Sequence, residues 1–113
     1  MSDTLFTKII NREIEADIVY EDDTVLAFRD IAPQAPLHVL VIPKKPIEML
    51  ARAGEDDRDV LGHMMLTAAK VAADEGYGDA FRLAMNNGEK AGQSVFHMHL
   101  HVLAGRAFEW PPG

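Results

Sequence analysis

Hydrophobic and polar residues alternate strictly toward the end of the chain, within the stretch QSVFHMHLHVLAG. Three histidines and three apolar residues take turns there, in the order His97, Met98, His99, Leu100, His101 and Val102. A period of two is the period of a β-strand, because successive side chains of a strand point to opposite faces. The pattern therefore predicts a strand with three imidazoles on one face and apolar side chains on the other.

Four further segments have the composition of strands, being short, apolar and rich in β-branched or aromatic residues. They lie at residues 16–20, 24–30, 37–43 and 80–86. The acidic residues 21–23 between the first two predict a hairpin turn, whereas the two prolines in residues 31–36 exclude regular structure there. Pro43 predicts the end of the third strand, because proline has no amide proton for the next bond of a ladder.

A period of three and four residues replaces the strand period from about residue 55 to residue 75, which predicts one long amphipathic helix. Its apolar stripe consists of Val60, Leu61, Met64, Met65, Ala68, Val71 and Ala72. Gly76 and Gly78 predict its end. A second, short helix is predicted near the N-terminus, with Asp3 or Thr4 as its N-cap. Its apolar stripe consists of Leu5, Phe6, Ile9 and Ile10.

About five strands and two helices, with sequence neighbours joined by short turns, predict an α+β fold. Short connections favour an antiparallel sheet, and we expect the helices on one side of it. The 113 residues contain no linker, repeat or low-complexity tract. Residues 1–113 are therefore expected to form a single domain.

The composition excludes several classes of function. The chain has no cysteine, so disulfides, thiolate metal sites and a cysteine nucleophile are impossible. Charged residues interrupt each apolar run near the N-terminus, so we expect no signal peptide and no membrane span, and a cytoplasmic location. The formal net charge is −7 and the basic residues are scattered, which argues against a DNA or RNA binder. A mononucleotide remains compatible, because a few local donors can hold one phosphate.

The row of imidazoles allows three interpretations. It can be the polar face of a half-buried strand, or it can bind a metal ion. A strand rises roughly 3.3 Å per residue, so His97 and His101 would lie about 13 Å apart, and one ion could bind only two neighbouring histidines. A zinc site would then need a third ligand such as His38. In the catalytic interpretation, the ~6.6 Å between neighbours suits a phosphate, which one neutral imidazole attacks while another donates a hydrogen bond.

The loop NNGEKAGQS leads directly into the histidine run. Gly88 and Gly92 allow backbone amides to close on an anion, and Gln93 and Ser94 add side-chain donors. Such a loop can equally be a plain hairpin connection. Next to three histidines, it becomes a candidate phosphate-binding loop.

Three polar residues outside this run are ambiguous. His38 begins a strand and is either a strand-end polar residue or a second imidazole that fixes the tautomer of a catalytic histidine. Asp30 follows a strand and either caps a turn or accepts the two hydroxyls of a ribose. His63 lies on the predicted long helix, where we expect a packing or surface role and no part in the site.

The pattern His-φ-His-φ-His-φ-φ resembles the signature of the histidine triad (HIT) family of nucleotide hydrolases and transferases. The resemblance to the Hint branch extends over nearly the whole chain, through the segments DTLFTKII, YEDD, LAFRDIAPQAPLHVLVIPKK, GQSVFHMHLHVLAGR and WPPG. It implies a HIT-like fold and a homodimer whose two sheets join into one. It also implies a purine nucleoside monophosphate moiety as ligand and hydrolysis of a P–N bond, without a metal or other cofactor.

The resemblance further implies the role of each site residue. His99 matches the nucleophile that forms a covalent nucleotidyl-imidazole, flanked by His97 and by His101, which bonds the α-phosphate. His38 matches the histidine that supports the nucleophile. Asp30 matches the ribose-binding acid. The remaining matches are Gln93, Ser94, Asn86 and Gly92 around the phosphate and leaving group, and Ile31, Phe6 and Ile9 around the base.

Arg29 and Pro46 stand where near relatives in this branch carry histidine, and neither is expected to touch the chemistry. Two other functions remain open within the resemblance: a dinucleoside polyphosphate hydrolase, and a nucleotide-binding scaffold whose turnover is incidental. A zinc protein is a third. Trp110 lies in an apolar tail, and we expect it to pack at the subunit interface near the partner's site.

Overall fold

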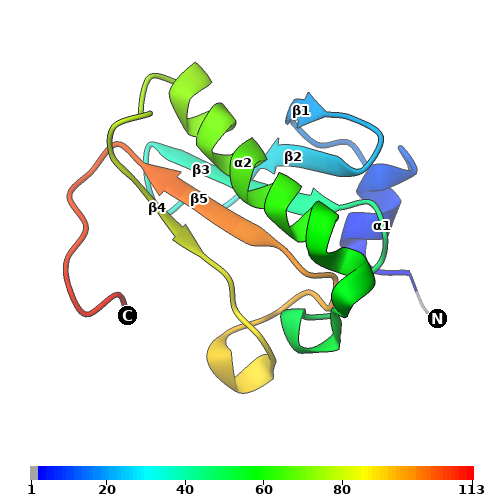
Figure 1. Cartoon of the computed structure of the whole chain (residues 1–113). Coiled ribbons are helices and arrows are strands. Elements are labelled where there is room, and N and C mark those ends of the chain that lie inside the picture. The colour runs from blue at the N-terminus through cyan, green and yellow to red at the C-terminus, as the bar shows by residue number, and fades with distance from the viewer. Residues whose placement is uncertain (1–2) are drawn as a thin grey trace.

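A five-stranded antiparallel sheet forms the centre of the protein in the computed structural model, which describes residues 3–113. The strands are β1 (Ile18–Glu21), β2 (Val25–Arg29), β3 (Leu37–Pro43), β4 (Phe81–Ala84) and β5 (Leu100–Ala104). The helices are α1 (Leu5–Ile10) and α2 (Arg58–Asp74), with 3₁₀ turns η1 (Leu50–Arg52), η2 (Glu55–Asp57) and η3 (Glu89–Ala91). The strand order β1-β2-β3-β5-β4 places β3 in the middle and β4 at one edge (Figure 1). The predicted α+β class, sheet type and numbers of strands and helices are confirmed.

The two helices lie on opposite faces of the sheet, so the expectation of helices on one side was wrong. Successive residues of β2 divide between two core clusters: Val25 and Ala27 pack with α2, and Leu26 and Phe28 pack with α1. All seven residues of β3 are buried. Because the middle strands are apolar on both faces, each face needs a covering layer. Figure 1 shows α2 across one of these faces.

The predicted helix ends agree with the structure. Thr4 is the N-cap of α1: its hydroxyl accepts the amide proton of Thr7, and the Thr7 hydroxyl accepts that of Thr4. Gly76 follows the last turn of α2 with φ of +92°, a left-handed conformation that favours glycine. No helix within the described residues is long and apolar enough to cross a membrane.

The strand predicted through all three histidines begins later than expected. β5 starts at Leu100, so His97 and His99 precede it in irregular backbone. The β3–β5 ladder pairs Val41 with Leu100 and stops there. Beyond that point β3 ends at Pro43, which has no amide proton to donate, and the chain before β5 bonds to the following turn instead, through Met98 N–H and the carbonyl of Ile47 at 2.7 Å.

Candidate active site

A cavity of about 320 Å³ opens on the sheet face that carries α1. Its walls come from α1, β2, the residues after β2 and the segment that enters β5. Nine of the predicted site residues line it: Phe6, Ile9, Asp30, Ile31, Asn86, Gly92, Ser94, His99 and His101. The volume lies in the range of small-molecule sites, and the cavity combines an apolar wall with a polar rim.

His99 presents an unprotonated nitrogen to this cavity. Its Nδ1 lies 2.9 Å from the carbonyl oxygen of His97, which can only accept, so Nδ1 carries the proton. The other nitrogen, Nε2, therefore holds a lone pair. The ring of Phe6 stands edge-on at 5.0 Å between centroids and restricts the rotation of the imidazole. His99 is buried, yet it lines the cavity.

His101, which lines the cavity, is hydrogen-bonded to His38, which does not. Nε2 of His38 lies 2.9 Å from Nδ1 of His101. The amide of Gln34 donates to Nδ1 of His38 at 3.0 Å, so that nitrogen is unprotonated and the His38 proton sits on Nε2. His38 thus donates to Nδ1 of His101, and the proton of His101 sits on its own Nε2. Nε2 of His101 is therefore a donor, whereas Nε2 of His99 is an acceptor.

Burial holds the imidazoles of the site in the neutral form at pH 7. The loss of hydration lowers the pKa of His38, His97 and His99 below the ordinary 6.5. The pKa of His101 falls to about 4, first through the loss of hydration and then through the neighbouring His99 and His38, against the opposing effect of Asp30. Neutral histidine is the form that can act as a nucleophile.

The side chain of His97, which precedes the proposed nucleophile His99 by two residues, does not line the cavity. Its side chain is 1% exposed, and Nε2–H donates to the carbonyl of Pro43 at 2.7 Å. Within residues 3–113, its Nδ1 has no hydrogen-bond partner. The turn of the chain before β5, where the strand period fails, carries this imidazole into the core.

Gln93 is likewise no free donor for a phosphate, contrary to expectation. Its side-chain nitrogen donates to the carbonyls of Glu48 (2.8 Å) and Val95 (3.0 Å), and its oxygen accepts the amide of Gly88. The side chain is 2% exposed. The amide is fully used in holding the 88–95 loop, whose glycines need such support.

Ser94, Asn86 and Gly92 line the cavity. Gly92 has φ of +100°, and a Cβ there would meet the Asn86 amide at 3.5 Å. One carboxylate oxygen of Asp30 accepts the Ala32 amide at 2.8 Å and so caps the turn, and the residue also lines the cavity. Its second oxygen lies 3.5 Å from Nε2 of His38.

Asp30, His38 and His101 are also the residues within 3–113 whose ligand atoms gather within 4.8 Å, as a metal site would need. Tetrahedral zinc spaces its ligands by roughly 3.4 Å, close to the observed separations. The protonation of His38, however, does not suit a metal ligand. Because Gln34 donates to Nδ1 of His38, Nε2 is protonated and offers no lone pair to a metal. A resident metal would require the Gln34 hydrogen bond to break.

Several cavity residues escaped the sequence analysis. Phe28 and Leu40 could have been found, because they share a strand face with residues of the α1 cluster. Ile14, Glu15 and Ala16 lie in irregular backbone without a periodic signal, and only the folded chain brings them to the cavity. The additional lining residues are Leu5, Ile14, Glu15, Ala16, Phe28, Arg29, Leu40 and Val95.

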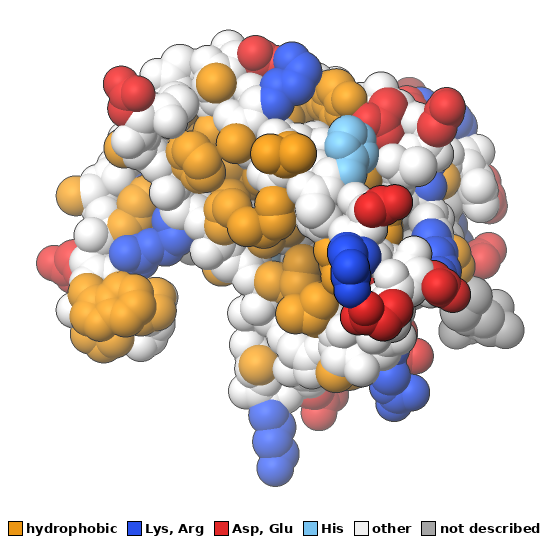
Figure 2. All heavy atoms as spheres, in the orientation of Figure 1, with side chains coloured by type: hydrophobic (Ala, Val, Ile, Leu, Met, Phe, Trp, Pro, Cys, Tyr) orange, Lys and Arg blue, Asp and Glu red, His pale blue; other side chains and the backbone are white. Residues whose placement is uncertain are grey.

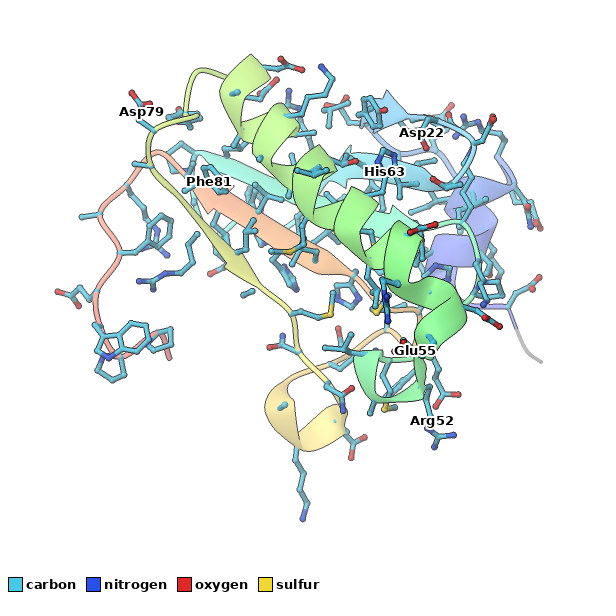
Figure 3. The ribbon with its side chains drawn as sticks, viewed as in Figure 1. Asp22, Arg52, Glu55, His63, Asp79 and Phe81 are labelled. Carbon is cyan, nitrogen blue, oxygen red and sulfur yellow. The ribbon has the colours of Figure 1, made fainter. Side chains whose placement is uncertain are left out.

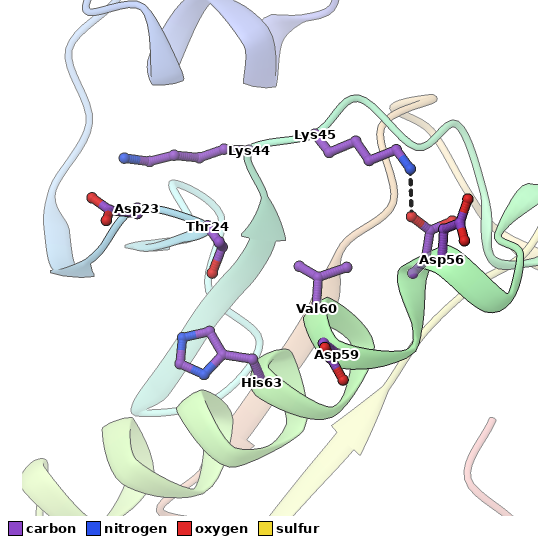
Figure 4. Close-up of a pocket in the computed structure, with 9 residues that line it drawn as sticks. Asp23, Thr24, Lys44, Lys45, Asp56, Asp59, Val60 and His63 are labelled. Carbon is purple, nitrogen blue, oxygen red and sulfur yellow. Dashed lines mark hydrogen bonds and ion pairs between the residues drawn. The ribbon is translucent and has the colours of Figure 1, made fainter.

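A broader hollow of about 610 Å³ lies elsewhere, between the β1–β2 turn, the end of β3 and the start of α2 (Figure 4). Its cations are already paired: Lys45 with Asp57 at 2.6 Å and Lys44 with Glu21 at 2.8 Å. His63 of α2 lines this hollow (Figure 4), and its Nε2 lies 2.6 Å from a carboxylate oxygen of Asp22; Figure 3 labels both residues. As predicted, His63 stays outside the histidine cavity, and its tether to the hairpin turn was not foreseen.

Comparison with known proteins identifies the class. A family model described as the HIT domain matches residues 11–108, so the chain belongs to the HIT family. It is 62% identical over 111 residues to an uncharacterized HIT-like protein of Synechocystis, covering 98% of this chain and 97% of the relative. It is 50% identical over 113 residues to the 14 kDa zinc-binding protein of Brassica juncea, covering 98% and 100%.

The fold agrees with a solved structure as well. The crystal structure of a HIT family hydrolase from Legionella pneumophila superposes with a TM-score of 0.96 at 46% identity, covering 98% of this chain and all of that one. The chain is therefore a hydrolase-like member of the HIT family.

Proposed function

We propose that this protein hydrolyses the P–N bond of purine nucleoside phosphoramidates, such as adenosine 5′-phosphoramidate, through a covalent intermediate on His99. One observation carries the proposal: a neutral imidazole with its lone pair on Nε2 lines a cavity of nucleotide size, beside a second imidazole that offers a proton. The family membership supports a nucleotide ligand, and the tautomers support the division of roles.

In the first step, the lone pair of His99 Nε2 forms a bond to the α-phosphorus. The P–N bond to the leaving group breaks, and its electron pair goes to the nitrogen. That nitrogen leaves as a neutral amine after gaining one proton from solvent, for which the hydroxyl of Ser94 at the rim is the relay. His101 donates from Nε2 to a non-bridging oxygen and stabilises the charge that develops there.

In the second step, water attacks the phosphorus of the nucleotidyl-imidazole. The bond from phosphorus to Nε2 of His99 breaks, the water proton returns to solvent, and a nucleoside monophosphate is released. The carbonyl of His97 holds the proton on Nδ1 of His99 throughout, so the ring returns in the starting tautomer.

The cavity walls divide the nucleotide between them. Asp30 accepts hydrogen bonds from the ribose hydroxyls, and Phe6, Ile9 and Ile31 enclose the base. Ile31 is 96% exposed and so forms the outer lip of this wall. The apolar enclosure favours a purine because a larger ring system buries more area.

Zinc has no part in the proposed reaction, although one relative is named for binding it. The lone pairs that zinc would need are occupied by the hydrogen bonds of His38. Hydrolysis by chelator-treated protein is the corresponding expectation.

The test compares hydrolysis of adenosine 5′-phosphoramidate by the wild type, His99→Asn and the control His63→Asn, which removes an imidazole far from the cavity. We expect His99→Asn to lose roughly a thousandfold or more in kcat while retaining AMP binding. The control should keep wild-type turnover. Full activity of a folded His99→Asn protein would sink the proposal. Hydrolysis of diadenosine triphosphate that is faster than that of adenosine 5′-phosphoramidate would instead indicate a dinucleoside polyphosphate hydrolase. Nucleotide binding without turnover would indicate a scaffold.

A homodimer is part of this proposal. β4 is an edge strand, and the adjoining face exposes apolar side chains, as the hydrophobic patches over α2 and β4 in Figure 2 show. Leu50, Met65 and Leu66 are 46%, 53% and 72% exposed, and an apolar hollow of about 240 Å³ lies beside the first two. Trp110 is 83% exposed in the single chain, and a partner subunit would cover it.

A further inference from the structure

We propose that Arg106 is a positioning residue, which acts through the backbone of Gln34 to hold the proton of His38 on Nε2. The consequence for turnover rests on the proposed function. The consequence for the tautomer of His38 does not.

Three hydrogen bonds connect the segment after β5 to the cavity. Nε of Arg106 donates to the carbonyl of Gln34 at 2.9 Å, and the Gln34 amide donates to Nδ1 of His38 at 3.0 Å. Nε2 of His38 then donates to Nδ1 of His101 at 2.9 Å. Both backbone groups of one residue, Gln34, are thus held in opposite directions, one by Arg106 and one by the histidine pair.

The loop that carries Gln34 needs such a tether. Residues 31–36 contain two prolines, and residues 31–34 are exposed. The Gln34 side chain bonds only within the loop, to the carbonyl of Ala32 at 3.0 Å. Nothing in these local contacts fixes the distance from the Gln34 amide to His38.

The segment after β5 is built to approach this loop closely. Gly105 has φ of +96°, and a Cβ at this position would lie 2.8 Å from Cβ of Pro36. Only glycine allows this contact, and it places Arg106 beside the loop. The guanidinium is fixed from the other side by the carbonyl of Ala107 at 3.1 Å and by the ring of Phe108 at 4.3 Å.

Loss of the hydrogen bond from the Gln34 amide to Nδ1 would allow His38 to exchange tautomers. With its proton on Nδ1, His38 would accept from Nδ1–H of His101, and Nε2 of His101 would lose its proton. His101 would then have no donor for the phosphate. Two groups face the His38–His101 pair. The carboxylate of Asp30 lies 3.5 Å from Nε2 of His38 and favours the proton on that nitrogen. The ring of His99 lies 5.1 Å from that of His101. Because Asp30 still favours the proton on Nε2, we expect His38 to lose this tautomer only in part.

The chain offers a matched control in Arg82. Its guanidinium also stacks on Phe108, at 5.0 Å, and donates to a backbone carbonyl, that of Glu109, at 2.9 Å. It has no bond to Gln34. Arg82→Ala therefore removes similar contacts from the same C-terminal segment and leaves the connection to His38 intact.

The experiment records long-range ¹H–¹⁵N correlations of ¹⁵N-histidine-labelled protein, which distinguish protonated from unprotonated ring nitrogens. The samples are the wild type, Arg106→Ala, Arg106→Lys, Arg82→Ala and Gln34→Ala. We expect His38 to be protonated on Nε2 in the wild type, Arg82→Ala and Gln34→Ala, because the last keeps its backbone amide. Both Arg106 variants should show a mixture of tautomers, since lysine keeps the charge but lacks the Nε–H fork.

Turnover is measured on the same samples. In the Arg106 variants, kcat should fall about 3- to 10-fold, the equivalent of one hydrogen bond, with KM little changed. An unchanged His38 tautomer in Arg106→Ala would overturn the proposal, and so would a changed tautomer with unchanged kcat. Absence of turnover in the wild type would overturn the proposed function alone, because the spectra would still judge the tether.

Discussion

The carbonyl oxygen of His97 lies 2.9 Å from Nδ1 of His99, and the imidazole of His97 is tied in turn to the carbonyl of Pro43 at 2.7 Å. The first histidine of the row therefore serves the second through its backbone, while its side chain anchors the segment to the end of β3. The proposed nucleophile owes its tautomer to a main-chain oxygen, which no substitution of the His97 side chain removes directly.

Stability should fall as the pH is lowered from 7 to 4, and His101 should account for a defined share of the loss. Its pKa is about 4 in the folded protein against an ordinary 6.5. Between these values the unfolded chain binds the proton and the folded chain does not, so acid favours unfolding. We expect the wild type to lose about 3 kcal/mol more than His101→Asn between the two pH values. Urea unfolding at pH 7 and pH 4 measures both losses, and equal losses would contradict the buried neutral state of His101.

Gln93 should contribute to stability more than a residue that merely contacts a ligand. Gln93→Met would leave the Gly88 amide and the carbonyls of Glu48 and Val95 without their side-chain partner. We expect a loss of roughly 2–4 kcal/mol in the free energy of unfolding. Ser94→Ala, a change at the exposed neighbouring position, should cost less than about 1 kcal/mol. Denaturant titrations of both variants decide the point: equal, small effects would show that the Gln93 amide is free to bind phosphate.

Leu66→Glu should convert the proposed homodimer into monomers. A charge on the exposed apolar face of α2 would have to be buried against a partner subunit, which is unfavourable without a compensating cation. Lys8→Glu places the same new carboxylate on an exposed position of α1, outside this face, and should leave the dimer intact. Sedimentation velocity gives the masses. A monomeric wild type, or a Leu66→Glu protein that stays dimeric, would refute this interface.

The sequence by itself determined the elements and most of the cavity. The β-branched composition and Pro43 predicted β3 at its observed ends, and the period of three to four predicted α2 to within a few residues, because these segments bury continuous apolar faces. Nine of the residues that the family resemblance named line the cavity, including His99 and His101.

Only the tertiary structure decided what each polar group does. The alternation placed all three histidines on one face of a strand, yet His97 lies in the core and His99 precedes β5, because the β3–β5 ladder ends at the pair Val41–Leu100. Gln93 and Ser94 are equivalent as donors in sequence, and contacts with residues as distant as Glu48 make one structural and leave the other at the rim. The tautomers that separate acceptor from donor depend on the backbone of His97 and Gln34. Backbone groups carry no sequence signal, so only the folded chain shows where they point.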